Sequence, residues 1–287
     1  MRHTLTTLCL LLAFSSAGAA QNPTDQQMSL EERQPLELVF ADSIVPQDRH
    51  EMMLTTGGWY FRRGVLREAA ITQKIEWGIS DRLQISTFAH LVNSSNLDGR
   101  TATGMGDIEI GSRYTWPAVG SQYTHLAVAM DAGFPTGDSR RGLGEGTYSV
   151  SPSVLFSREL RRGKCQLFST TGMEFIVGRR PIEHSLDAPR NSVFSNSGVS
   201  LKAGHGWIIG EISVSSDRWN GGNNTSGILT PSYVWRLASR TELLFGVPLG
   251  FTSSTNRLGA VIKFTFELGG GAIKNRSASS SRNHGGL

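Results

Sequence analysis

This 287-residue sequence lacks paired cysteines and clusters of metal ligands. Outside its N-terminus, it also lacks apolar runs long enough for membrane helices. Its 2 cysteines are Cys9 and Cys165, and Cys9 lies in an apolar N-terminal stretch that we expect to be removed. One remaining cysteine forms no internal disulfide. An exported chain of this kind therefore depends on a large core or on a membrane for its stability.

A helical membrane protein needs apolar runs of about 18 residues, and only the N-terminus approaches that length. Met1–His3 is a basic start, Leu8 to Phe14 is apolar, and Ala17 to Ala20 are small residues. This order is typical of a secretory signal peptide. We predict a signal peptide at residues 1–20, cleaved near Ala19 or Ala20, with Cys9 too early to be the lipidated residue of a lipoprotein.

The sequence has no block of like charges, because its 28 basic and 24 acidic residues are interspersed and give a net charge of only +4. This pattern indicates solvated surfaces and argues against a nucleic-acid partner. The hydrophobic fraction of 38% is low and the 33 glycines are many. Transmembrane β-barrels have such a composition because only one face of each strand is apolar.

Residues 53–268 are predicted to form an all-β, transmembrane antiparallel β-barrel of about 12 strands. Most candidates have ten to thirteen residues, near the ~9–11 of a membrane-crossing strand and above the ~5–6 of soluble sheets. The candidates are 53–62, 66–77, 83–92, 106–116, 122–134, 145–158, 165–177, 193–203, 206–216, 227–237, 241–250 and 257–268. Pro152 and Pro231 fall inside two of them and predict bulges or local breaks.

Apolar and polar side chains alternate along these candidates. In the last one an apolar set opposes a mostly polar set: Leu258, Ala260, Ile262, Phe264, Phe266 and Leu268 against Arg257, Gly259, Val261, Lys263, Thr265 and Glu267. In a membrane barrel the apolar set faces lipid. The alternative is a water-soluble barrel of the lipocalin kind, whose apolar set faces inward.

The links between candidates alternate in length. Short links follow the second, fourth, sixth, eighth and tenth candidates, and longer ones, 93–105, 135–144, 178–192 and 217–226, follow the third, fifth, seventh and ninth. Bacterial barrels have short periplasmic turns and long external loops. We therefore expect both termini in the periplasm and the longer links outside.

Two terminal segments lie outside the predicted barrel. Residues 21–52 are polar and proline-containing around an apolar island, Leu36 to Phe40, and fit a periplasmic segment, a plug or an extra strand. Residues 269–287 are predicted to be a flexible polar tail, without the terminal aromatic residue that outer-membrane barrels usually carry. The barrel assembly machinery is an expected partner, and Phe266 is the internal candidate for its signal.

An ordered set of motifs in the middle of the chain resembles a known family. Its members are outer-membrane transporter-like proteins named for the MetA pathway of phenol degradation. The motifs are Glu76-Trp77-Gly78-Ile79-Ser80-Asp81-Arg82-Leu83, Gly104-x-Gly106-Asp107-Ile108-x-Ile110-Gly111-x-Arg113-Tyr114, Pro135-Thr136-Gly137-Asp138 and Gly144-x-Gly146-x-Tyr148-x-x-x-Pro152. The resemblance spans roughly Leu36 to Leu268. It implies a barrel in the outer membrane of a Gram-negative bacterium, associated with small apolar or aromatic compounds.

Charged residues of both signs occupy the polar sets and are our candidates for facing the lumen. Ions in a narrow lumen pair with one another, whereas an unpaired ring of one sign would select ions. We expect the paired arrangement, and the excess of acids argues against an anion pore. The candidates are Glu68, Lys74, Glu76, Asp107, Glu109, Arg113, Asp131, Glu174, Lys202, Glu211, Arg236, Glu242, Lys263 and Glu267.

Pro135, Thr136, Gly137 and Asp138 are predicted to form a turn in an external loop. Proline and glycine suit a type II turn, and the aspartate can bond nearby backbone. The functional alternative is a loop that folds inward and narrows the pore. The glycines around it resemble phosphate-binding loops only superficially, because a strand and not a helix follows them.

No catalytic, cofactor-binding or metal-binding residues are predicted. His90 and His125 have no serine two residues further on, His184 and Ser185 are adjacent in a loop, and no histidine pair has metal-ligand spacing.

The sequence therefore predicts an outer-membrane channel for passive uptake of small, hydrophobic or aromatic compounds, surrounded by outer-membrane lipid. A non-conducting structural or adhesive barrel is the alternative, and a barrel enzyme is the third.

Overall fold

The computed structural model describes residues 34–63, 66–97, 100–161, 164–179, 191–222, 224–252 and 258–269. The predicted signal peptide, residues 21–33 and nearly all of the predicted tail lie outside the described residues. Within these ranges no helix is long and apolar enough to cross a membrane.

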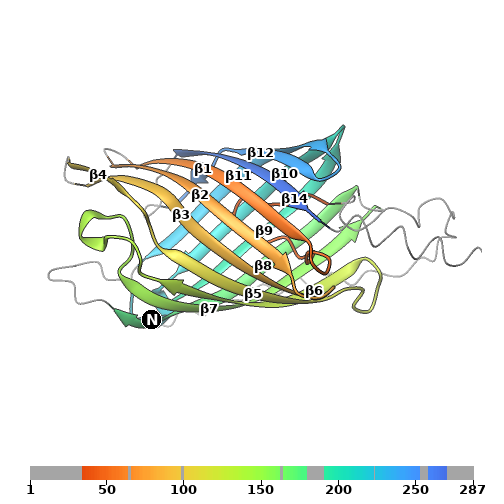
Figure 1. Ribbon diagram of the computed structural model, residues 1–287, viewed down its shortest axis with the longest axis horizontal. Helices are drawn as coiled ribbons and strands as arrows, with labels where there is room; N and C mark the ends of the chain where they lie inside the picture. Colours follow the sequence, from red (N-terminus) through yellow and green to blue (C-terminus); the bar gives the residue numbers. More distant parts are fainter. Residues whose placement is uncertain are drawn as a thin grey trace, which may run out of the picture.

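One antiparallel sheet closes on itself, because β1 pairs with both β2 and β14 (Figure 1). The strands are β1 (Met52–Arg63), β2 (Leu66–Gly78), β3 (Leu83–Leu97), β4 (Arg100–Gly104), β5 (Ile108–Trp116), β6 (Thr124–Phe134), β7 (Thr147–Leu160), β8 (Cys165–Arg179), β9 (Ser192–Ala203), β10 (Gly206–Ser216), β11 (Thr225–Ala238), β12 (Thr241–Gly246), β13 (Leu249–Gly250) and β14 (Leu258–Leu268). Two short 3-10 turns, Ser139–Arg141 and Arg218–Asn220, lie in the loops.

These strands build a barrel of 12 strand positions. Both β4 and β5 pair with β3, and both β12 and β13 pair with β11 and β14, so each of these couples fills a single position in the wall. Every strand position then has a neighbour on both sides and the wall is closed, although β4 itself is paired with β3 alone. The predicted fold and strand number are confirmed.

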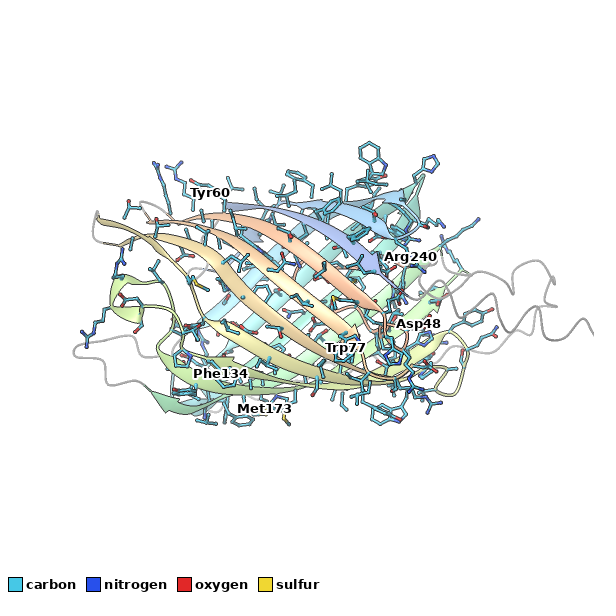
Figure 2. The ribbon with its side chains drawn as sticks, viewed as in Figure 1. Asp48, Tyr60, Trp77, Phe134, Met173 and Arg240 are labelled. Atoms are coloured by element: carbon cyan, nitrogen blue, oxygen red, sulfur yellow. The ribbon has the colours of Figure 1, made fainter. Side chains whose placement is uncertain are left out.

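The two faces of the wall have opposite character. On β14, Ile262 and Phe264 are 50% and 45% exposed on the outer face, whereas Val261 and Thr265 are 1% exposed on the inner face. Exposed aromatic side chains gather near both ends of the strands, for example Tyr60 at 42% near one end and Trp77 at 41% near the other (Figure 2). An apolar outer face between aromatic girdles is that of a transmembrane barrel, so the lipocalin-like alternative is wrong.

Two predicted segments differ from the structure. Residues 93–105, expected to be a loop, continue β3 and turn back as β4, because a polar strand outside the lipid has no apolar face that marks it in the sequence. Residues 241–250, expected to be one strand, are broken between β12 and β13 at Val247 and Pro248. Proline has no N–H to continue the ladder.

The two prolines noted in the sequence interrupt pairing on one side only. β7 keeps its register with β6 at Pro152, but its pairs with β8 stop at Val150 and resume at Ser153. Likewise Pro231 is paired with Gly210 of β10, while on the other side β11 has no pair between Leu229 and Ser232. Local breaks were expected there, and local breaks are found.

Residues 34–51 run inside the barrel and form no strand; we call them the inner segment. Leu38, Val39 and Ala41 pack in one apolar cluster with inward-facing residues of five strands, among them Trp207. Ile44 packs separately against Ala127 and Leu155. The buried apolar core of this barrel is therefore the contact between the inner segment and the wall.

Gly78, at the end of β2, lets the inner segment reach the wall. A Cβ added there would collide with the carbonyl oxygens of Asp48 and Gln47, whereas one added at Gly210 would meet no atom within 4 Å. We expect Gly78→Ala to lower the free energy of unfolding by about 1–3 kcal/mol through overpacking. Urea titration of the barrel in lipid measures this. Gly210→Ala is the matched control, and equal losses in both variants would contradict the prediction.

Candidate functional site

The lumen has two halves of different content. Short turns close one end of the barrel, at 79–82, 117–123, 204–205 and 239–240, and we call it the turn end; the opposite end is the loop end. The inner segment fills the half at the turn end, and a cavity occupies the half at the loop end. Any path through the barrel has to cross both.

Glu211 holds the middle of the inner segment. Its carboxylate, on a residue that is 0% exposed, accepts hydrogen bonds from the backbone N–H groups of Val39 at 2.6 Å, Phe40 at 2.9 Å and Ala41 at 3.0 Å. A buried carboxylate is tolerated only when such donors replace its water. This one residue thus satisfies three successive backbone groups of a segment that has no secondary structure.

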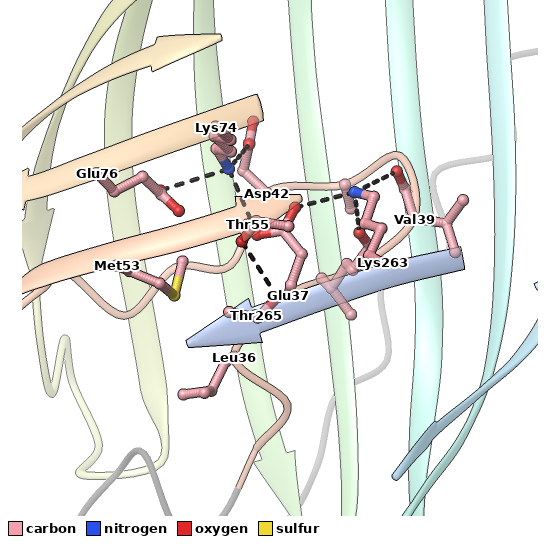
Figure 3. Close-up of polar contacts among 12 residues, drawn as sticks. Leu36, Glu37, Val39, Asp42, Met53, Thr55, Lys74, Glu76, Lys263 and Thr265 are labelled. Atoms are coloured by element: carbon pink, nitrogen blue, oxygen red, sulfur yellow. Dashed lines mark hydrogen bonds and ion pairs between the residues drawn. The ribbon is translucent and has the colours of Figure 1, made fainter. Parts of the chain in front are cut away.

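A network of ion pairs lies beside it (Figure 3). Lys263 donates to Glu37 at 3.0 Å and to the carbonyl oxygens of Leu38 at 2.7 Å and Val39 at 3.1 Å. Lys74 lies 3.5 Å from Glu37 and 3.4 Å from Asp42. Both lysines come from the wall and both acids from the inner segment, so these pairs join the segment to the barrel.

Further contacts fix the two ends of the inner segment. Glu242 accepts from the backbone N–H of Leu36 at 2.8 Å and pairs with Arg236 at 2.7 Å. At the other end, Arg113 donates to the carbonyl oxygen of Val45 at 3.2 Å and lies 3.6 Å from Glu76. Charges on several strands therefore pair partly with each other and partly through the inner segment.

The charge on Glu37 is expected to make docking of the inner segment depend on pH. Burial acts to raise the pKa of Glu37, but the attraction of Lys263 and Lys74 outweighs it and holds the pKa below the ordinary value of 4.5. A lowered pKa means that this contribution to docking is complete above about pH 4.5 and is lost as the pH falls through the lower value.

We therefore expect acidification from about pH 6 to about pH 3 to release the inner segment, as the Glu37 carboxylate loses its charge. Single-channel current recorded as a function of pH would rise on the acid side. In Glu37→Gln the acid response should be weakened, because the charge is already absent. An identical pH profile in both proteins would contradict the assignment.

The cavity at the loop end has a volume of about 480 Å³, and we call it the vestibule. Its lining combines aromatic rings with carboxylates: Trp59, Phe61, Glu68, Phe88, His90, Asp107, Glu109, Leu143, Glu145, Thr147 and Glu174 belong to it. Trp59 separates the two halves of the lumen, since its ring lies 5.6 Å from that of Phe40 in the inner segment and 5.9 Å from that of Phe61.

Asp107 folds a loop over the vestibule. Its carboxylate accepts from the backbone N–H groups of Gly137 at 2.8 Å and Glu145 at 2.7 Å. Gly142 to Glu145 consequently line the cavity, and Leu143 is buried at 2% exposure. The loop that carries Pro135–Asp138 thus takes the inward course that the sequence left as the functional alternative.

The predicted type II turn is not formed at Pro135–Asp138. The N–H of Thr136 bonds to the carbonyl oxygen of Phe134 at 2.8 Å, which is a three-residue turn, and none of these four residues has a positive φ. Asp138 instead caps the 3-10 turn through the N–H of Arg140. The hydrogen bond that Gly137 donates to Asp107 holds the chain inward. This bond accounts for the difference between the predicted and the observed turn.

Without the Asp107 carboxylate we expect this loop to leave the vestibule. Asp107→Ala removes two hydrogen bonds to a charged group, about 2 kcal/mol of loop attachment in a partly solvated site. Trypsin cleavage at Arg140 and Arg141 should accelerate by about thirtyfold. Asp131→Asn, an inward carboxylate without a bond to this loop, should leave the rate unchanged. A similar acceleration in both variants would contradict the assignment.

The charges proposed from the sequence as lumen residues divide between the two halves. Lys74, Glu76, Arg113, Lys202, Glu211, Arg236, Glu242, Lys263 and Glu267 lie in the half at the turn end, and Glu68, Asp107, Glu109, Asp131 and Glu174 in the half at the loop end. All the basic candidates lie in the half at the turn end, and the candidates in the half at the loop end are all acids. The expected mixed pairing therefore describes only the half that holds the inner segment.

Sequence reasoning missed the uncharged residues of the vestibule. Trp59, Phe61, Phe88 and His90 belong to the inward sets of β1 and β3, so the alternation that selected the charges marked these residues as well. Thr147 gives no such signal. It is the first residue of its strand, where alternation is not yet established.

Metal and enzyme chemistry find little support among the described residues. No group of three or more histidine, cysteine or acidic side chains could hold a metal ion. His125 lies 3.8 Å from Glu159, both buried near the turn end, and its partner across the β6–β7 ladder is Ser157. Ser157, however, accepts a bond from Gln166 at 2.7 Å, and none of these residues lines the vestibule.

Comparison with solved structures identifies several barrels of this type. The COG4313 outer membrane channel from Pseudomonas putida F1 has a TM-score of 0.64 and 9% identity over 80% of this chain and 100% of that one. The NanC porin has a TM-score of 0.53 and 11% identity over 75% of this chain and 100% of its own. The fold is that of an outer-membrane barrel.

The KdgM porin is a further example, with a TM-score of 0.51 and 5% identity over 75% of this chain and 99% of its own. At such identities the likeness concerns the fold alone. No protein-family model matches the sequence, and no curated protein matches it.

Proposed function

We propose that this protein is an outer-membrane channel for passive uptake of small, hydrophobic or aromatic solutes, as members of the family it resembles are presumed to be. The observation that carries the proposal is the lumen itself. A closed barrel with an apolar outer face contains a lined cavity of about 480 Å³. A purely structural barrel needs no such cavity, whereas a pore needs a place for its solute to enter.

The vestibule supports the proposed solute class. Trp59, Phe61 and Phe88 offer ring faces and edges to a bound molecule. Aromatic side chains bury much apolar area and prefer stacked or edge-on contact with other rings. A small aromatic compound entering from the loop end would therefore be retained above the inner segment. In this proposal the loop end faces the exterior and the turn end faces the periplasm.

The inner segment acts as a plug in this proposal. Its contacts with Glu211, Lys263, Lys74, Glu242 and Arg113 stop the lumen below Trp59. Passage then requires the segment to shift within the barrel or to leave it. The predicted partners are outer-membrane lipid around the apolar belt and the barrel assembly machinery during insertion.

A vesicle assay tests the proposal. Purified full-length protein is reconstituted into lipid vesicles, and entry of 2-phenylethanol is compared with entry into protein-free vesicles. We expect faster entry that depends on the amount of protein. If the protein neither accelerates entry of any small aromatic solute nor conducts ions in planar bilayers, the channel function is wrong.

The second candidate is a barrel that never conducts. It is favoured by the number of contacts that hold the inner segment in the half at the turn end, where Glu211 alone binds three of its backbone groups. The same vesicles distinguish the two functions, because a sealed barrel accelerates no solute at any pH, whereas a gated channel responds to conditions that release the inner segment.

A further inference from the structure

The vestibule carries a concentration of negative charge that uptake of a neutral aromatic compound does not require. Glu68, Asp107, Glu109, Glu145 and Glu174 all line it, and none of its lining residues, all within the described ranges, is lysine or arginine. Lys74 and Arg113, wall cations in the half at the turn end, are engaged by Glu76 and by the inner segment. The cavity thus has a negative potential that no lining cation offsets.

Two polar groups in the same cavity lack partners among the described residues. Thr147 is 4% exposed, faces inward at the start of β7, and its hydroxyl oxygen makes no hydrogen bond. The Nδ1 atom of His90 is likewise buried without a partner. Buried polar atoms are normally bonded, so an unsatisfied pair that lines a cavity points to a missing ligand or to water. A hydroxyl oxygen beside carboxylates is an acceptor suited to a cationic donor.

Aromatic side chains line the vestibule beside the carboxylates, since Phe88 is paired with Glu109 across β3 and β5. Trp59 and Phe61 stack at 5.9 Å, and Phe88 meets His90 edge-on at 5.1 Å. Ring faces attract cations and also bind an apolar body. Trp59 already has Lys263 at 5.3 Å from its ring centroid, so the wall uses the same ring for a cation in the other half of the lumen.

We propose that the vestibule binds a small organic cation, a protonated amine on an aromatic or apolar body. The ammonium group would lie between Glu109, Glu174 and the Thr147 hydroxyl, and the body would pack on Trp59, Phe61 and Phe88. This rests on the proposed channel function and narrows its solute class. A neutral aromatic compound would bring no counter-charge to Glu109 and Glu174, and an anion would be repelled.

The pKa of Glu145 agrees with this assignment. Confinement of its carboxyl in the vestibule, together with the charges of Glu174 and Asp107, raises its pKa to about 7. Burial is the largest cause of this rise in pKa, and the remainder reflects repulsion from the carboxylates of Glu174 and Asp107. A bound cation relieves that repulsion.

Three molecules of the same shape test the proposal. 2-Phenylethylammonium, 2-phenylethanol and phenylacetate are titrated into the full-length protein in detergent, with binding measured by calorimetry. We expect the ammonium ion to bind at least about tenfold more tightly than the alcohol, with no measurable binding of the carboxylate. Raising the ionic strength from about 0.05 to about 0.5 M should weaken the binding of the ammonium ion and leave the binding of the alcohol unchanged.

Variants locate the site. The double variant Glu109→Gln with Glu174→Gln should lose at least about tenfold in ammonium affinity and retain its affinity for the alcohol, which also shows that it is folded. Asp81→Asn, an exposed carboxylate in a turn at the opposite end, should bind like the wild type. Binding of the alcohol as tight as that of the amine, or an unchanged affinity in the double variant, would overturn the proposal.

The test of the cation site can fail or succeed independently of the test of the channel function. If the ammonium ion does not bind preferentially but vesicles still admit 2-phenylethanol, the charge assignment is wrong and the channel function stands. If the ammonium ion binds but vesicles admit neither molecule, the site is real and the channel function is wrong.

Discussion

Deleting residues 34–47 opens the barrel. We expect the single-channel conductance of this variant to exceed that of the full-length protein by at least about tenfold, because the inner segment is the material that fills the lumen near the turn end. The strands lose no ladder hydrogen bond, since Gln34 to Gln47 pair with no strand. Asp48 to Glu51 remain and preserve the turn that leads into β1. Planar-bilayer recording measures the change.

The barrel survives this deletion for a physical reason. Glu211, Glu242 and Lys263 lose buried partners, and in a sealed protein core each unpaired ion would cost several kcal/mol. Here the vacated lumen admits water, which solvates them. We expect a modest fall in stability from the lost apolar contacts of Leu38 and Ile44, while the outer belt is unchanged.

A second variant controls for length. Replacing residues 34–47 by a glycine and serine sequence of equal length keeps the chain in place but removes its contacts with the wall. Conductance should then fluctuate between blocked and open levels, because a linker of this composition is flexible. Unchanged conductance in both variants would show that the inner segment does not block the path.

Much of the wall was predictable because a two-faced strand repeats its character every second residue. Ile262 and Lys263 are assigned to opposite faces by their neighbours alone, and the structure gives them 50% and 8% exposure. The same rule explains why alternation does not distinguish polar β4 from a loop, since both faces of a strand beyond the lipid are polar. Pro248 interrupts the strand because it has no N–H to donate to the ladder, although the alternation of apolar and polar residues continues through it.

The position of the inner segment could not be predicted from the sequence. It has no period, so no rule assigns Glu37 or Asp42 to a face, and their partners Lys263 and Lys74 are distant in sequence. The apolar island Leu36 to Phe40 was visible, but an apolar island fits a strand, a tail or a plug equally well. The acceptors that Glu211 offers to three consecutive N–H groups, together with the contacts of Lys263 and Glu242, decide where it lies.

Lys263→Met loosens the inner segment without shortening it. Lys263 donates to Glu37 and to two backbone carbonyl oxygens, and it is 8% exposed. Removing one partner of a buried pair costs about 3 kcal/mol, because the other charge stays behind. Glu37 then retains only the more distant Lys74, at 3.5 Å. The ratio of docked to released segment should fall by about a hundredfold.

The expected record is opening to the level of the 34–47 deletion, about a hundredfold more often than in the wild type. Lys202→Met is the matched control, because Lys202 carries the same charge on the wall and lies 5.9 Å from the ring of Trp207. Among the described residues it forms no side-chain hydrogen bond or ion pair with the inner segment. It should conduct like the wild type. If Lys202→Met opens as often as Lys263→Met, loss of positive charge and not release of the segment controls the current, and the plug is wrong.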